Sequence, residues 1–266
     1  MMYFEVVKTN ILLSMMYKWN LIITSLVDGF RFIAEYVFWA VIFAASTNSE
    51  MYGHTIETII TYYLLMYVIG TLTGMGNLGY KAAEDIKDGR LSNLLMKPLS
   101  CFKYYFCESA GQKLPQFICS AIAFIPIMLI FRKQITVTGN MANLLFFLLA
   151  LALAIMLTYV ISLLFSMLVF WLTDITGLFF MKDIIIDLLS GRIFPIDIMP
   201  AGMFAFLGLL PFSYCTYFPI SILTGDKSLS GILWGFAFQV LWIVVCYILC
   251  KILWARGIMR YQGTGM

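Results

Sequence analysis

Long apolar segments recur along this chain, and only short polar stretches separate them. Of the 266 residues, 62% are hydrophobic and 12% are charged, whereas soluble domains carry about 25% charged residues. The mean hydropathy of +0.93 agrees with this composition. An apolar helix of about 20 residues crosses a bilayer, because it pairs its own backbone groups where water is absent. The sequence therefore predicts an all-α, multi-pass membrane protein.

Six segments are predicted to span the membrane, and the fifth is the weakest because Lys182, Asp183 and Asp187 interrupt it. Lysines and arginines gather in the stretch 80–113 and near the C-terminus, and basic loops stay in the cytoplasm. We therefore expect an even number of spans with cytoplasmic N- and C-termini. The richness in Ile, Met and Phe suggests a bacterial cell membrane. The predicted spans cover about 20–45, 58–79, 114–131, 143–171, 175–189 and 232–253.

Residues 1–19 form a separate unit before the six-span domain, which occupies 20–266. Phe4, Val7, Ile11 and Met15 recur at helical spacing with polar residues between them. This pattern predicts an amphipathic helix that lies in the plane of the membrane interface.

The first two spans carry unusual residues. Asp28, Arg31 and Glu35 are spaced i, i+3, i+7 and share one helix face. Charged groups inside a span usually face the protein interior and are paired. Two interpretations remain open: the polar lining of a pathway or dimer seam, or a self-satisfied ladder of ion pairs near the inner interface. In the second span, Gly70 and Gly74 form a G-x-x-x-G motif, which permits close helix approach.

The densest run of charge lies at residues 84–99, inside the predicted cytoplasmic loop 80–113. Leu91, Leu94 and Leu95 give this run one apolar stripe at helical spacing, bracketed by Gly89 and Pro98. A short amphipathic helix of this kind lies at the membrane surface or is pressed into another protein. The neighbouring carboxylates of the run are expected to form a solvated charged face.

Four prolines divide the apolar stretch 190–226, which is therefore expected to form short re-entrant or interfacial helices on the outer side. A single kinked span is the alternative. The prolines are Pro195, Pro200, Pro211 and Pro219.

Motifs for catalysis are missing from the sequence. It contains no G-x-x-x-x-G-K-[ST] loop and no H-E-x-x-H motif. The six cysteines lack the paired C-x-x-C spacing of a zinc site, and only Cys215 is predicted to lie outside the cell, where it has no partner for a disulfide. His54, the only histidine, is predicted to be a plain loop residue. We therefore expect no enzyme activity, no metal site and no cofactor in this chain.

Two stretches resemble signatures of a known family. Residues 86–99, from Ile86 to Leu99, are similar to the signature I-x-x-G-x-L-x-x-L-L-x-(K/R)-P-L of ABC exporter permeases of the type-2 family, in their uncharacterised-export subgroup. The stretch before the last span resembles the second signature of that subgroup. Its matching residues are Gly191, Pro195, Pro200, Pro211, Phe212, Pro219 and Gly225.

The resemblance implies a permease subunit that moves a hydrophobic or amphipathic cargo (a drug, an antimicrobial peptide or a lipid) out of the cell by alternating access. Its implied partners are two cytoplasmic P-loop ATPase subunits, which bind ATP and Mg²⁺, and a second permease, identical or related. No nucleic-acid partner is expected. The resemblance assigns ATPase docking to a coupling helix with Ile86, Asp88, Gly89, Arg90, Leu91, Leu94, Leu95, Lys97 and Pro98.

Two other functions remain open on the residues alone. An ion-driven secondary transporter would use intramembrane carboxylates as proton relays, with Asp28, Glu35, Asp183 and Asp187 as candidates. An immunity or sensor protein would instead bind a peptide with its outer segments. An adjacent reading frame that encodes a P-loop ATPase would favour the exporter.

Overall fold

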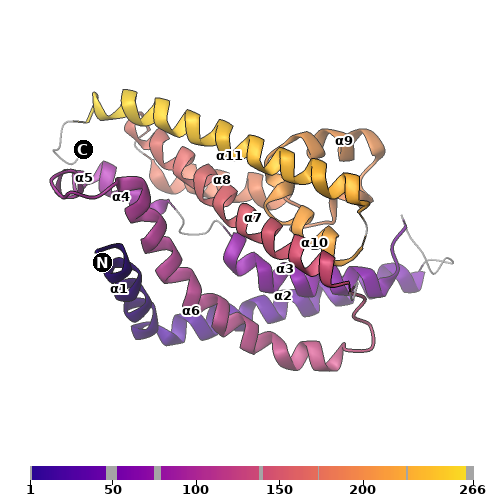
Figure 1. The fold of residues 1–266 in the computed structure, drawn as a ribbon. Coiled ribbons are helices and arrows are strands. Elements are labelled where there is room, and N and C mark those ends of the chain that lie inside the picture. The colour runs from indigo at the N-terminus through magenta and orange to yellow at the C-terminus, as the bar shows by residue number, and fades with distance from the viewer. Residues whose placement is uncertain are drawn as a thin grey trace.

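In the part of the chain that the computed structural model describes, every regular element is a helix (Figure 1). It describes residues 2–45, 53–74, 79–137, 140–172, 174–225 and 227–261. The first five helices are α1 (Met2–Met16), α2 (Lys18–Ala45), α3 (Ile56–Thr73), α4 (Tyr80–Lys87) and α5 (Leu91–Leu95). They are followed by α6 (Cys101–Ile130), α7 (Met141–Met167), η1 (Leu168–Phe170), α8 (Ile175–Leu189), η2 (Ile196–Ile198), α9 (Ala201–Leu209), η3 (Phe212–Tyr214), α10 (Tyr217–Leu223) and α11 (Leu229–Ile258).

Four helices of the described chain are long and apolar enough to cross a membrane: α3, α6, α7 with η1, and α11. The six-span prediction adds α2 and α8. Helix α2 has 28 residues but carries Asp28, Arg31 and Glu35 in its apolar part. Helix α8 has 15 residues, fewer than the roughly 20 that cross the hydrocarbon core without bilayer thinning.

Helix α7 is central to the packing, because α11, α10 and α3 all contact it. Buried side chains form one cluster around α4, α7, α8 and α11, and a second around α2, α3, α10 and part of α6. Gln239 of α11 bridges two elements by donating hydrogen bonds to the carbonyls of Ala150 (3.1 Å) and Tyr214 (3.0 Å). Such bonds satisfy backbone groups that lipid could not.

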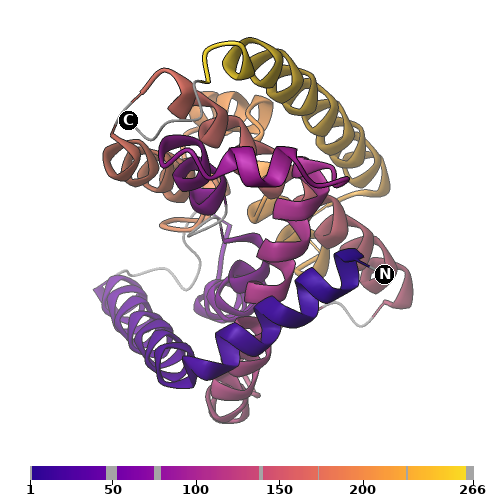
Figure 2. The same cartoon turned by 90° about the vertical axis from the view of Figure 1, so that its left-hand side faces the viewer.

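Both chain ends lie at the same end of the molecule as α4 and α5, and α9 and α10 lie toward the opposite end (Figure 1). Figure 2 views the first end and shows α1 crossing α6. The crossing is close at Gly111, where an added Cβ would lie 2.6 Å from the carbonyl oxygen of Val7. Of the predicted apolar stripe on α1, Phe4 and Met15 are exposed, and Val7 and Ile11 are half-buried.

The predicted loop 80–113 is wrong in its second half. Residues from Cys101 onward belong to α6, a continuous helix of 30 residues. Pro115 was expected at the start of the third span but lies inside this helix, as Pro126 does. A proline removes one backbone hydrogen bond, which neighbouring elements in a membrane bundle can offset.

The prolines of 190–226 break this stretch into short helices, as predicted. Pro195, Pro200 and Pro211 immediately precede η2, α9 and η3, and Pro219 lies near the start of α10. Each position needs no N–H from the proline, because the first turn of a helix leaves its donors unpaired.

Candidate functional site

The loop that joins α4 to α6 lies at the end of the molecule that holds both termini, and ion pairs and hydrogen bonds fix its conformation. Helix α4 stops at Lys87, and Gly89 follows in the left-handed region with a φ of 74°. Ile86 therefore belongs to α4, and the predicted coupling helix is reduced to the five residues of α5. Glycine enters the left-handed region without the steric cost of a side chain, which makes the stop at Gly89 readable from the sequence.

Ion pairs fix the start of this loop. Arg90 contacts Asp85 (Nε–Oδ1, 3.1 Å), Asp88 (Nη2–Oδ2, 2.9 Å) and Glu84 (Nη2–Oε2, 3.4 Å). The hydrogen bond to Asp85, helped by the other two carboxylates, raises the pKa of Arg90 above its usual value. Asp85 is buried and also accepts a hydrogen bond from the Tyr105 hydroxyl (3.1 Å). The prediction of a solvated face is wrong for Asp85, since it ties α4 to α6.

The three leucines of the predicted stripe do not share one environment. Leu91 is 0% exposed and Leu94 is 7% exposed, both within the core of this chain. Leu95 is 42% exposed, and the next residue, Met96, is 78% exposed. We call the exposed part of this loop the docking tip. It comprises Asp88, Arg90, Asn93, Leu95, Met96, Lys97 and Pro98.

Two tyrosines from distant parts of the chain hold the loop on either side of the docking tip. The hydroxyl of Tyr261 lies 3.1 Å from both the backbone nitrogen and the Oγ of Ser92, and the backbone nitrogen donates to it. The hydroxyl of Tyr3 accepts a hydrogen bond from the backbone nitrogen of Ser100 (3.1 Å). Helix α1 and the segment that follows α11 are therefore both attached to the loop.

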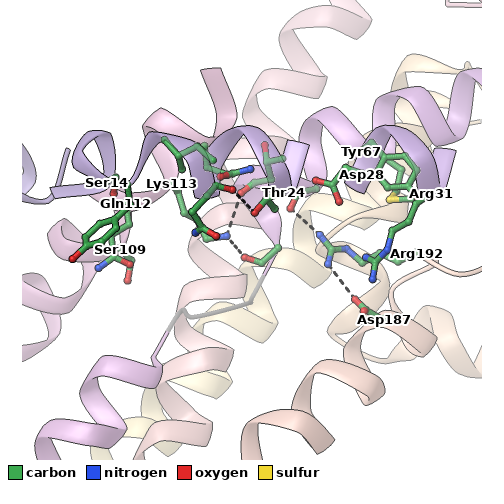
Figure 3. Close-up of a pocket in the computed structure, with 18 of the residues that line it drawn as sticks. Ser14, Thr24, Asp28, Arg31, Tyr67, Ser109, Gln112, Lys113, Asp187 and Arg192 are labelled. Atoms are coloured by element: carbon green, nitrogen blue, oxygen red, sulfur yellow. Dashed lines mark hydrogen bonds and ion pairs between the residues drawn. The ribbon is translucent and has the colours of Figure 1, made fainter. Parts of the chain in front are cut away.

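A second feature is a polar cavity of about 980 Å³ (Figure 3). Helices α1, α2, α3 and α6 and the segment 187–193 line it. Three carboxylates and three cations face it, together with amides and hydroxyls. The charged residues are Asp28, Arg31, Glu35, Lys113, Asp187 and Arg192.

The charged face of α2 lines this cavity, as one of the two sequence interpretations required. Glu35 accepts a hydrogen bond from the Tyr67 hydroxyl (Oε1, 3.0 Å). Asp28, Arg31 and Glu35 form no ion pair with one another in the described structure. The self-satisfied ladder is therefore absent, although the three residues share a face.

The C-terminal end of α3 is stabilised by two cations from elsewhere in the chain. Arg192 donates to the Gly70 carbonyl (2.8 Å) and pairs with Asp187 (3.1 Å), and Lys113 donates to the carbonyls of Thr71 (3.1 Å) and Gly74. The last carbonyls of a helix have no intrahelical partner and carry partial negative charge. The sequence did not indicate this arrangement.

The G-x-x-x-G motif has a different role from the one predicted. A Cβ at Gly70 would lie 3.0 Å from the Nη2 of Arg192, and a Cβ at Gly74 would lie 2.9 Å from the same atom. The glycines thus make room for a guanidinium group. The prediction of close helix approach at this motif is wrong because the space is filled by a side chain.

We expect Arg192→Leu to lower the free energy of unfolding by about 2 kcal/mol, because two hydrogen bonds of a charged donor are lost. The bond to Asp187 contributes the smaller part, since solvent screens this half-exposed ion pair. The thermal unfolding temperature of the purified chain measures the change. Asp187→Asn keeps the contact to Gly70 and should cost less than about 1 kcal/mol. Equal losses in the two variants would show that the α3 carbonyl contact contributes nothing.

The residues of the second signature order the segment after α8. Gly191 has a φ of 85°, and its carbonyl accepts a hydrogen bond from the Tyr62 hydroxyl (2.6 Å). Phe212 lies in η3, Pro219 is buried in α10, and Gly225, with a φ of 82°, follows α10. None of these side chains lines the polar cavity, so their contribution is to the shape of the segment.

His54 is not the plain loop residue that the sequence predicts. Its Nε2 lies 3.1 Å from Oδ2 of Asp197, which also accepts a hydrogen bond from the Tyr217 hydroxyl (3.1 Å). Burial raises the pKa of Asp197, but the contacts with His54 and Tyr217 outweigh burial and lower it overall. This cluster joins the start of α3 to η2 and α10.

Comparison with known proteins adds one positive finding. A family model described as "ABC-2 family transporter protein" matches residues 30–265. The matched region includes the docking tip and most of the elements that line the polar cavity. No curated protein and no solved structure matches the chain.

Proposed function

Because the chain belongs to the ABC-2 family of transporter proteins, we propose that it is the permease subunit of an ATP-driven exporter. In this proposal two cytoplasmic P-loop ATPase subunits bind ATP and Mg²⁺ and supply the energy. A second permease, identical or related, completes the membrane part. The cargo is hydrophobic or amphipathic and leaves the cell by alternating access.

The docking tip is the observation that carries this proposal. It exposes Leu95 and Met96 on a loop that is otherwise fixed by ion pairs and hydrogen bonds. A rigid element with exposed apolar residues is suited to a groove on another protein, since little ordering is needed on binding. The partner contacts would come from this tip and not from Leu91 or Leu94, which the chain itself buries.

The proposed orientation of the permease in the membrane follows from the positions of its basic residues. The end of the molecule that holds both termini carries basic residues in the loop, at the start of α6, in the last turn of α11 and just after it: Lys97, Lys103, Arg256 and Arg260. Basic residues beside membrane spans favour the cytoplasm. The docking tip would then face the cytoplasmic ATPase, and α9 and α10 would lie on the outer side.

Helix α6 offers a mechanical connection between the tip and the cavity. Its first turns hold the loop through Tyr105 and Asp85, and its middle lines the cavity with Gln112, Lys113 and Gln116. At 1.5 Å per residue the helix is about 45 Å long. In the proposed mechanism, closure of the ATPase dimer moves the tip, and α6 transmits this movement to the cavity.

The exposed side of α2 supports the proposal that a second permease contacts this helix. Arg31 is exposed in the single chain, next to exposed apolar residues such as Ile33 and Phe30. A charged side chain that faces lipid is costly, so it is expected to face another protein or water. A second permease on this side would close the polar cavity between the two halves.

A pull-down of the intact chain from its native membrane in mild detergent tests the proposal, with mass spectrometry of the eluate. We expect a stoichiometric P-loop ATPase. A second six-span protein in the same eluate would establish a heterodimer. An eluate with neither protein would contradict the exporter and favour an ion-driven transporter that uses Asp28 and Glu35.

A further inference from the structure

The cations that line the polar cavity differ in how many hydrogen bonds and ion pairs they form with other groups of this chain. Lys113 and Arg192 are both bound to carbonyls at the end of α3, and Arg192 is also paired with Asp187 (Figure 3). These two side chains stabilise the fold. Their charge is largely compensated by partners that belong to the protein.

The carboxylates of α2 are not compensated in this way. The Oε1 of Glu35 accepts a hydrogen bond from Tyr67, but its Oε2 is buried and has no hydrogen-bond partner among the described residues. Asp28 is half-buried, and no hydrogen bond or ion pair to it is present in the described structure. A desolvated carboxylate without a partner is costly. In the described structure, Asp28 and one oxygen of Glu35 therefore accept no hydrogen bond from the chain itself.

Among the described residues, Arg31 forms no ion pair, although it lies near these acceptors. It lies one turn from Asp28 and one turn from Glu35 on the same helix face, yet it pairs with neither in the described structure. Its side chain is exposed, whereas the free oxygen of Glu35 is buried. Both carboxylate side chains line the cavity and neither is paired with Arg31, so a ligand that enters the cavity can approach them.

The walls next to Glu35 are apolar and aromatic. Tyr67, which donates a hydrogen bond to Glu35, and its neighbour Met66 both line the cavity. The Tyr67 ring is held by stacking on Phe124, with ring centroids 5.6 Å apart and an interplanar angle of 18°. Aromatic faces attract cations, and methionine adapts to apolar groups of varied shape. This surrounding suits a ligand that carries both a cation and an apolar body.

We propose that the cavity binds the ammonium or guanidinium group of a cationic amphiphile, with Asp28 and Glu35 as acceptors and the apolar body against Tyr67 and Met66. The proposal rests on the proposed function in that such a ligand would be the cargo. The proposal restricts the cargo to cationic molecules and excludes neutral and anionic lipids.

A matched pair of fluorescent probes tests this on the purified full chain in mild detergent. Dansylcadaverine carries a primary ammonium on an apolar body, and its N-acetyl derivative is neutral with almost the same body. We expect dansylcadaverine to bind at least about tenfold more tightly, because the neutral probe loses a charge-assisted hydrogen bond. Equal affinities would overturn the proposal, and this comparison needs no variant to fold.

Variants then locate the acceptors. Asp28→Asn and Glu35→Gln should each weaken dansylcadaverine binding about tenfold and leave binding of the neutral probe unchanged. Arg31→Gln is the matched control in the same cavity, and it should leave the affinity equal or higher. A loss of binding in Arg31→Gln, or full binding in both carboxylate variants, would contradict the assignment.

The result of the probe experiment is independent of the result of the pull-down that tests the exporter. A chain that copurifies with a P-loop ATPase but does not discriminate between the probes keeps the proposed function and loses the cationic cargo. A chain that discriminates between the probes without any ATPase keeps the cation site and loses the ATP-driven mechanism.

Discussion

Replacing both Leu95 and Met96 by glutamate is expected to abolish copurification of the ATPase while leaving the permease folded. Each anchor of this kind is worth about 2 kcal/mol when a partner buries it, so the double change weakens docking by roughly a thousandfold or more. The glutamates add the cost of desolvating two carboxylates. The two side chains are exposed in this chain, so their loss opens no cavity in its core.

Glutamates on a different exposed apolar surface provide the control. Phe206 and Leu209 of α9 are each 59% exposed and lie toward the opposite end of the molecule. Phe206→Glu with Leu209→Glu should leave the amount of copurified ATPase unchanged. Retention of the ATPase by the Leu95/Met96 variant would show that the docking tip is not the contact surface.

Gly79→Ala is expected to have the largest effect on stability, with a loss of about 3 kcal/mol in the free energy of unfolding. Gly79 has a φ of 78°, and an alanine there loses about 1–2 kcal/mol for the left-handed conformation. Its Cβ would also lie 2.4 Å from Oγ of Ser166 and 2.7 Å from the carbonyl oxygen of Ser162. The carbonyl cannot rotate away without bending α7. Thermal unfolding of the purified chain in detergent measures the loss.

Two other glycines separate the contributions. Gly53 has a φ of 81°, but nothing lies within 4 Å of an added Cβ, so Gly53→Ala reports the conformational cost alone. Gly202 lies in α9 with open space around it, and Gly202→Ala should stabilise by about 0.5–1 kcal/mol. If Gly79→Ala costs no more than Gly53→Ala, then α4 does not pack on α7 as closely as described.

Local features of the docking loop could be predicted from the sequence, but their partners could not. The spacing of Leu91 and Leu94 predicted a short helix, and Gly89 predicted its boundary; both are present. The same spacing could not tell whether the apolar face is covered by this chain or by another. Periodicity reports that a face is apolar, whereas the buried cluster that includes Leu91 and Leu94 also draws residues from α7, α8 and α11, which are distant in sequence.

The cavity shows the same limit. The spacing of Asp28, Arg31 and Glu35 placed them on one face, and this face does line the cavity. The role of Gly70 was missed because Arg192 lies 122 residues further along the chain, and no local pattern connects the two. The long helices followed from composition alone, since any membrane span must be apolar.

The contact of Tyr261 with Ser92 has a consequence for chimaeric permeases. An exchange of the segment between α4 and α6 alone would keep the backbone donor to Tyr261, which any residue except proline supplies, but would lose the contact with the Ser92 hydroxyl at 3.1 Å unless the new loop carried a hydroxyl there. Designers who wish to redirect this subunit to another ATPase should therefore transplant residues 80–100 together with the residues that follow α11 as far as Tyr261. The two segments act as one structural unit and have to be exchanged together, although more than 150 positions separate them in the printed sequence.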